Sequence, residues 1–177
     1  MILEVVTIIT AVAALITANA ALKSARNTSN LISASLLDSV LKDYANRDML
    51  NSMKSLQRFK KLCENTNKLF DQEFRELEKS DEEKYDNLDA DRRRFFLHFY
   101  RIYRLNQAKL ITDDLIKKMV YPDEVIFLFN TILPLVKSKA LSIELPYDNE
   151  LFTKFKKIFK NDDDVKSHVD FTKYPDI

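Results

Sequence analysis

The sequence predicts an all-α protein in which an N-terminal transmembrane helix continues into a small cytosolic helical bundle. The 177 residues contain no glycine, and glycine normally supplies the positive-φ positions of tight hairpins, so a hairpin-rich sheet is disfavoured. Apolar side chains recur every three or four residues through most of the chain, which is typical of amphipathic helices. The lack of glycine also excludes the P-loop and the dinucleotide-binding fingerprint.

Composition indicates a folded chain with segregated charge. Hydrophobic residues make up 46% and charged residues 31% of the sequence, which is typical of a globular rather than a disordered protein. The formal charge of +1 predicts no bulk attraction to nucleic acid. Residues 23–61 hold eight basic and three acidic side chains, residues 71–91 three and ten, and residues 92–118 eight and two. Such blocks either pair within the fold or bind a partner.

The first element is an uncharged stretch of eighteen residues, 5–22, which is near the lower length limit for a helix that crosses a bilayer. Lys23 and Arg26 flank it, and the positive-inside rule then places the N-terminus outside and the remainder in the cytoplasm. We therefore expect a single-pass protein of the inner (plasma) membrane that contacts membrane lipid. The apolar residues expected to face lipid are Val5, Ile9, Val12, Leu15, Ile16 and Leu22.

Two other interpretations of this segment stay open. A buried core helix would be equally apolar, and residues 18–20 resemble the small-residue cleavage site of a signal peptide, although Glu4 stands where a signal peptide carries basic residues.

In a transmembrane helix, small residues allow another helix to approach closely. The expected packing face of the span consists of Ala11, Ala14, Ala18 and Ala21.

The chain after the span divides into four segments. Residues 23–78 are expected to form a long juxtamembrane helix and a second helix, with a turn at residues 44–46. Residues 79–91 are acidic and poor in apolar side chains, so we expect a mobile linker there. Residues 92–160 are expected to form the helical bundle, and residues 161–177 a polar, loosely held tail.

The bundle has recognisable helix boundaries. An aromatic helix is expected from Asp91, and Thr112 suits the N-cap of the helix after it. Pro122 fits the first position of a further helix, which Pro134 is expected to kink or end. The predicted buried face of the aromatic helix comprises Phe95, Phe99, Ile102, Tyr103 and Asn106.

Two basic features are candidate contacts for a partner or for lipid headgroups. The first is Arg92, Arg93 and Arg94, since cations at a helix N-terminus oppose its dipole and need compensation. Pairing with the acidic residues just before them is the alternative. The second is the helix of residues 151–160, which suits either an anionic membrane surface or closure of the core. Its candidate contact residues are Phe152, Phe155, Lys156, Lys157 and Phe159.

No catalytic, cofactor or metal site is predicted. His98 and His168 are the two histidines and Cys63 is the single cysteine, which is too few for the characteristic ligand sets of zinc. The acidic residues 81–91 lack both the calcium-loop pattern and its glycine. No glycine-flanked nucleophile turn is present either.

Three stretches of the chain resemble proteins of the DUF4760 type, which are prokaryotic single-span membrane proteins with a cytosolic helical domain. They are the apolar segment with its basic flank, residues 44–50 and residues 92–119. In that group a paired arginine opens an aromatic helix, as at Arg92, and a leucine-isoleucine turn follows, as at residues 110–111. The resemblance covers about half of the chain, lacks the glycine expected after Leu105, and implies no activity.

These features favour a non-enzymatic, membrane-anchored helical interaction protein, expected to be an accessory subunit of a larger membrane complex. Its partners would be membrane lipid and other protein subunits, with no cofactor, metal or nucleic acid. The alternative function is a free-standing membrane-anchored regulator or defence-type effector that acts at the bilayer through the basic helix of residues 151–160.

Overall fold

The computed structural model of the protein describes residues 17–24, 28, 31, 34–35, 38–39, 42, 47–142 and 149–175. The chain divides into two units, Met1–Ser39 and Val40–Ile177. In the first unit, residues 17–24 are helical and exposed. Across all described residues the regular structure is helical and contains no strand, which confirms the all-α fold class.

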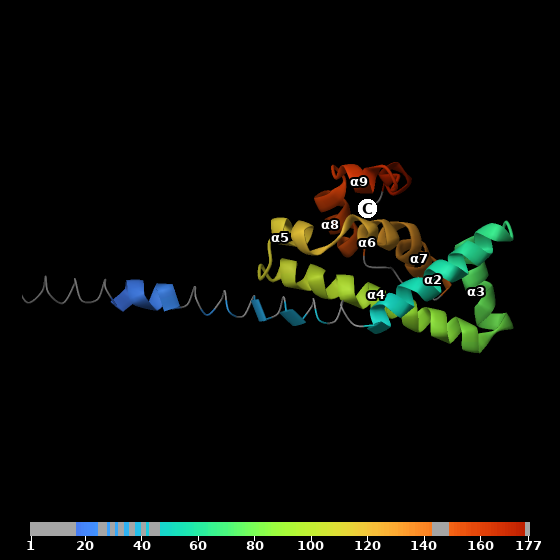
Figure 1. Cartoon of the computed structure of the whole chain (residues 1–177), viewed down its shortest axis with the longest axis horizontal. Helices are drawn as coiled ribbons and strands as arrows, with labels where there is room; N and C mark the ends of the chain where they lie inside the picture. Colours follow the sequence, from blue (N-terminus) through green and yellow to red (C-terminus); the bar gives the residue numbers. More distant parts are fainter. Residues whose placement is uncertain are drawn as a thin grey trace, which may run out of the picture. The chain divides into compact units, whose positions relative to one another are not determined.

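The second unit is built from helices of very different length (Figure 1). The bounds in chain order are α2 Arg47–Asn65, α3 Phe70–Ser80, α4 Glu82–Gln107, α5 Asp113–Met119, α6 Pro122–Phe127, the π-helical turn η1 Leu128–Ile132, α7 Leu133–Ser142, α8 Glu150–Phe159, α9 Asp163–Lys166 and the 3-10 turn η2 Phe171–Lys173. The longest of these helices, α4, packs against α2, α3, α8 and η1.

Within the described part of the chain, no single helix combines the length and apolarity that crossing a bilayer requires. One pair of helices, Asp113–Met119 and Pro122–Lys139, meets that requirement when taken together, although the two are bent by 96° relative to each other. The predicted transmembrane helix falls mostly on residues 5–16, which lie outside the described residues.

Phenylalanine dominates the core of the second unit. The ring of Phe95 meets Phe127 edge-on with centroids 4.7 Å apart, and Phe99 meets Phe155 in the same way at 5.1 Å. Edge-to-face pairs of this kind stabilise beyond the area that they bury, by about 0.5–1.5 kcal/mol each. The fully buried phenylalanines are Phe74, Phe95, Phe99, Phe129, Phe152, Phe155 and Phe159.

Several predicted boundaries and faces are confirmed. Four of the five residues predicted for the buried face of the aromatic helix are buried, and Asn106 is half-buried. The hydroxyl of Thr112 caps α5 by accepting a hydrogen bond from the amide of Leu115 at 3.2 Å. Pro122 is the first residue of α6. These features depend on side chains close in sequence, which is why the pattern alone reveals them.

The predicted acidic linker over residues 79–91 is wrong, because residues 82–91 form the first turns of α4. Asp81 separates α3 from α4, and its carboxylate accepts a hydrogen bond from the amide of Lys84 at 3.1 Å. The acidic first turn is favoured by the helix dipole. Tyr85 and Leu88 are the two large apolar side chains here, yet both are buried, and their spacing of three residues places them on one face.

The predicted loose tail is also wrong for the residues that the structure describes there. Residues 163–166 form α9 and residues 171–173 form η2. Val165 and Val169, four positions apart, are buried. The ammonium of Lys156 in α8 donates a 2.8 Å hydrogen bond to the carbonyl of Tyr174 and so holds the end of the segment.

Pro134 does not end its helix; instead, a π-turn precedes it. The amide of Leu133 donates to the carbonyl of Leu128, five positions back. Since proline has no amide proton, the carbonyls of Phe129 and Asn130 receive no hydrogen bond from position 134 in either helical register. They are satisfied from outside the helix: Tyr174 donates to Phe129 at 3.2 Å, and Lys60 donates to Asn130 at 2.9 Å.

Candidate functional site

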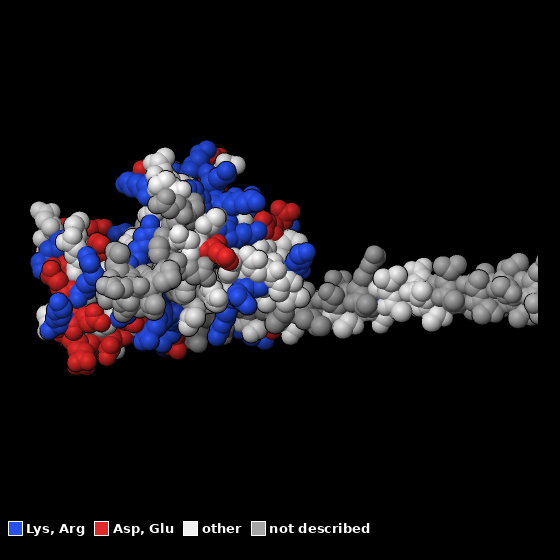
Figure 2. All heavy atoms as spheres, turned by 180° about the vertical axis from the view of Figure 1, so that it is seen from behind, with Lys and Arg blue, Asp and Glu red and all other residues white. Residues whose placement is uncertain are grey.

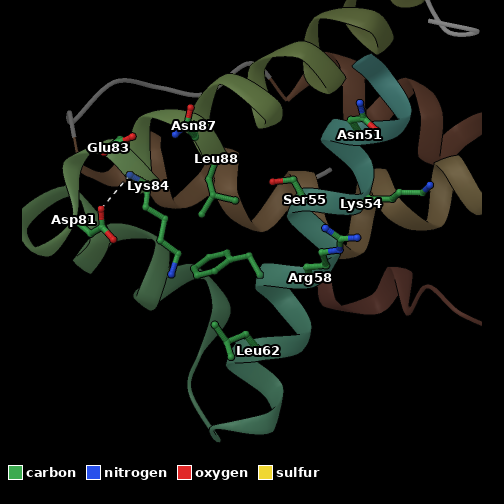
Figure 3. A pocket seen from close by; sticks show the side chains of 11 residues that line it. Asn51, Lys54, Ser55, Arg58, Leu62, Asp81, Glu83, Lys84, Asn87 and Leu88 are labelled. Carbon is green, nitrogen blue, oxygen red and sulfur yellow. Dashed lines mark hydrogen bonds between the residues drawn. The ribbon is translucent and has the colours of Figure 1, made fainter. Parts of the chain in front are cut away.

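A groove of about 780 Å³ lies between α2 and the start of α4 (Figure 3). Its α2 wall is one helix face, because the lining residues of that helix recur every three or four positions. Phe59 and Leu88 are buried at its base, whereas Leu62 is 52% exposed. The lining residues are Asn51, Lys54, Ser55, Arg58, Phe59 and Leu62 from α2, Asp81 at the junction of α3 and α4, and Glu83, Lys84, Asn87 and Leu88 from α4.

Basic side chains dominate the α2 wall of this groove. Lys54 and Arg58 are exposed, and within the described part of the chain the structure gives neither an ion pair nor a hydrogen-bond partner through its side chain. From the opposite wall, Lys84 extends toward Phe59, with its ammonium 5.7 Å from the ring centroid. A cation over an aromatic face is attracted by about 0.5–1 kcal/mol at exposed sites. The α2 wall thus offers positive charge next to a small apolar base, whereas Asp81 and Glu83 add negative charge on the opposite side of the groove.

A polar network joins α2 and α4 through Ser52. The hydroxyl of Ser52 donates to Asp91 Oδ1 at 2.7 Å and accepts from Arg94 Nη1 at 2.5 Å. Two residues earlier, Arg92 Nε lies 2.8 Å from Asp89 Oδ1, with both side chains largely buried. Both of these residues belong to α4, so this ion pair stabilises α4 itself, and removing one member of a buried pair typically costs about 3–5 kcal/mol. The polar link between the two helices that form the groove is made by Ser52.

The three arginines do not stand at a helix N-terminus as predicted, because α4 begins ten positions earlier at Glu82. The alternative of internal pairing is confirmed: Arg92 and Arg93 pair with Asp89, and Arg94 pairs with Asp91. Arg92 is buried and therefore unavailable to a partner, so the prediction that Arg92 contacts a partner or a lipid headgroup is wrong. Arg93 keeps 60% of its side chain exposed and Arg94 47%.

Helix α8 is a core element, which overturns the prediction that its phenylalanines contact lipid or a partner. Phe152, Phe155 and Phe159 are each no more than 1% exposed. The ammonium of Lys156 donates hydrogen bonds to the carbonyls of Phe171 and Tyr174 in the C-terminal segment. Among the predicted contact residues of α8, Lys157 is the exposed one.

A second polar cluster ties the end of α4 to α5 and α8. The Asn106 amide donates to Asp113 Oδ1 at 2.9 Å, and the Lys154 ammonium lies 2.7 Å from the same oxygen. The hydrogen bond from Lys154 is the main reason that the pKa of Asp113 lies below its ordinary value. Tyr103 donates a hydrogen bond to Glu150. These contacts are structural, since they close the bundle around α4.

Neither metal nor thiol chemistry is indicated in the described residues. No group of three histidine, cysteine or carboxylate side chains there is arranged to hold a metal ion. Cys63 is buried, and burial raises the pKa of its thiol. A thiol of this kind is inert rather than nucleophilic.

Few residues of the predicted membrane segment are described. The described ones are helical and exposed, namely Ala18, Ala21, Leu22 and Lys23. The remaining predicted residues of the span, its packing face and its flank lie outside the described residues, namely Val5, Ile9, Ala11, Val12, Ala14, Leu15, Ile16 and Arg26.

Surface charge on the second unit is uneven. Figure 2 shows acidic side chains gathered around the corner where α3 meets α4, as the acidic block of residues 71–91 predicts, and basic side chains over α8. Sequence reasoning missed the groove because it placed a linker where the first turns of α4 form one of its walls. The four-residue spacing of Lys54 and Arg58 was the signal available for the other wall.

The fold and the groove together define a small helical bundle with an open, basic-walled surface site. In comparisons with known proteins, no family model, curated protein or solved structure matches the chain.

Proposed function

We propose that the protein is a non-enzymatic, membrane-anchored interaction protein, an accessory subunit of a larger membrane complex. In this proposal, residues 5–22 span the inner membrane and the second unit lies in the cytoplasm. Another subunit docks an acidic, amphipathic helix into the groove between α2 and α4. Membership of the DUF4760 type is still a prediction, and the architecture proposed here is consistent with it.

The observation that carries the proposal is the basic wall of the groove. The α2 lining extends from Asn51 to Leu62, about 17 Å at 1.5 Å per residue, which matches three turns of a docked helix. Lys54 and Arg58 lie one turn apart on that length, and neither forms an ion pair within the described residues. An acidic partner would neutralise them, and apolar partner residues would cover Leu62 and Phe59.

The burial of α8 weighs against the alternative of an effector that acts on the bilayer through that helix. Presenting Phe152, Phe155 and Phe159 to lipid would remove them from the core. Removing a phenylalanine side chain from a core typically costs about 3–5 kcal/mol. The cost for all three together is comparable with the whole free energy of unfolding of a domain of this size.

The test is extraction of the full chain from native membranes in mild detergent, followed by size-exclusion chromatography and mass spectrometry of the peak. We expect a partner of fixed stoichiometry. Replacing Lys54 and Arg58 together by Glu should lower its recovery at least tenfold, because two attractive contacts become repulsive, each change being worth more than about 1 kcal/mol.

The matched control replaces Lys61 and Lys160 by Glu, since both are exposed and neither lines the groove. Recovery should then stay at the wild-type level. A peak that contains one chain and no partner would contradict the accessory-subunit proposal. Equal loss of the partner in both double variants would show that overall charge, not the groove, controls binding.

A further inference from the structure

One stripe of α4 lies mostly outside the core of the bundle and is separate from the groove, although its Tyr100 is half-buried against the core. Its spacing of four and three residues in alternation is that of a helix surface that packs against another helix. Leu97 at its centre is 51% exposed. We call this stripe the outer face of α4, and it consists of Asp86, Ala90, Arg93, Leu97, Tyr100 and Arg104.

The outer face changes sign along its length. Asp86 lies toward the acidic start of the helix, whereas Arg93 and Arg104 lie in its middle and at its end. The helix dipole favours acids in the first turn and bases in the last, but its effect falls off within one turn. It therefore accounts for Arg104 and for neither Arg93 nor the exposure of Leu97.

This pattern is self-complementary when the helix meets an antiparallel copy of itself. With the symmetry axis at the level of residue 95, Asp86 of each copy stands opposite Arg104 of the other. Ala90 stands opposite Tyr100, so that a small side chain faces a large one. Arg93 stands opposite Leu97, whose exposed surface the aliphatic stem of arginine can cover.

We propose that two copies of this protein associate through the outer faces of their α4 helices, antiparallel and related by a two-fold axis. A parallel pair would place Arg104 against Arg104 and Asp86 against Asp86, which is repulsive. The antiparallel pair instead makes each Asp86–Arg104 contact twice, as an isologous interface requires. This proposal concerns a surface and a partner different from those of the groove.

Contacts between neighbouring turns of α4 hold the side chains of the outer face in place before association. The Arg104 guanidinium carbon lies 6.0 Å from the centroid of Tyr100, and the ring of Tyr100 stacks beside Phe96 at 6.0 Å. Arg93 Nε lies 3.2 Å from Asp89 Oδ2, which restrains its stem on the helix surface. Side chains that are already ordered lose less entropy on binding.

The interface is narrow and charged, so we expect a dimer of micromolar affinity that weakens with salt. The experiment is sedimentation velocity on the full chain in density-matched mild detergent, at a protein concentration of about 100 μM, where such a dimer is mostly formed. It is run at about 0.05 M and about 0.5 M salt, since screening lengths shorten strongly between these values. The dimer should prevail at low salt and lose at least threefold in affinity at high salt.

Charge exchange tests the register. Asp86→Arg and Arg104→Asp should each weaken the dimer at least tenfold, whereas the double variant Asp86→Arg with Arg104→Asp should recover most of the affinity, because both contacts form again with reversed polarity. Leu97→Lys, a further exposed change, should also weaken it. Glu76→Arg and Lys61→Asp, which are exposed on other helices, serve as controls and should leave it unchanged.

Three results would overturn the proposal: a monomeric wild type at low salt, single variants that dimerise like the wild type, or a double variant that fails to recover. Circular dichroism of each variant confirms that its helices are intact. Capture of a partner subunit by Asp86→Arg separates this proposal from the docking groove, because that capture should persist when the dimer is lost.

Discussion

Lys154 and Asp113 show how a single ion pair joins two helices of this bundle. The ammonium lies 2.7 Å from one carboxylate oxygen and 3.0 Å from the other, so it closes α8 onto the first turn of α5. Asn106 of α4 donates to the same carboxylate. Because Asp113 is 45% exposed, solvent screens the pair and limits its contribution to less than about 1 kcal/mol.

The pair predicts a specific acid sensitivity. The pKa of Asp113 is lowered in the folded protein, chiefly by the hydrogen bond from Lys154, from an ordinary value of 3.8. Its stabilisation is therefore complete above that value and is lost as the pH falls through the lowered folded-state pKa. Urea unfolding of wild type and Lys154→Met between about pH 5 and pH 2 checks this, with a smaller loss of stability expected in the variant. Identical pH slopes would contradict it.

The π-turn before α7 shows how one element depends on others for its hydrogen bonds. Pro134 cannot donate a hydrogen bond to the carbonyls of Phe129 and Asn130, and these carbonyls accept hydrogen bonds from Tyr174 of the C-terminal segment and from Lys60 of α2. An unsatisfied buried carbonyl costs about 1–3 kcal/mol. A proline inside a helix is thus tolerated because α2 and the C-terminal segment pack on either side of it.

This dependence is testable with a double-mutant cycle. Lys60→Met should lower the free energy of unfolding by about 1–2 kcal/mol, because the Asn130 carbonyl loses its donor. In a Pro134→Ala background the same change should cost less than half as much, since the alanine amide can serve that carbonyl. Chemical denaturation of the four proteins measures the coupling, and strictly additive costs would contradict the explanation.

At the scale of the whole second unit, residues 162–174 belong to the same packed body as the helices before them. Val165 and Val169 are buried, and Phe171 packs edge-on against Phe129 with ring centroids 5.1 Å apart. The contacts of α9 with α6 place this C-terminal segment over the middle of the chain. The segment should therefore unfold together with the rest of the unit.

Native-state hydrogen exchange tests that cooperativity. The amide of Val169 donates to the carbonyl of Val165 at 2.8 Å, and we expect it to exchange only through global unfolding, with the same opening free energy as amides in the middle of α4. An opening free energy lower by more than about 2 kcal/mol would instead identify a segment that detaches separately. The amide of the exposed Thr172 in η2 is the comparison and should exchange faster.

The sequence by itself determined the helical class, the faces of the long helices, the cap at Thr112 and the helix start at Pro122, because these depend on residues within one or two turns. Only the tertiary structure decided that residues 82–91 are helical and that the C-terminal segment docks. In both places a few apolar side chains suffice once other helices cover them, and such covering is a long-range property that local composition does not carry. The groove arises for the same reason, since each wall is an ordinary polar helix face until the other stands beside it.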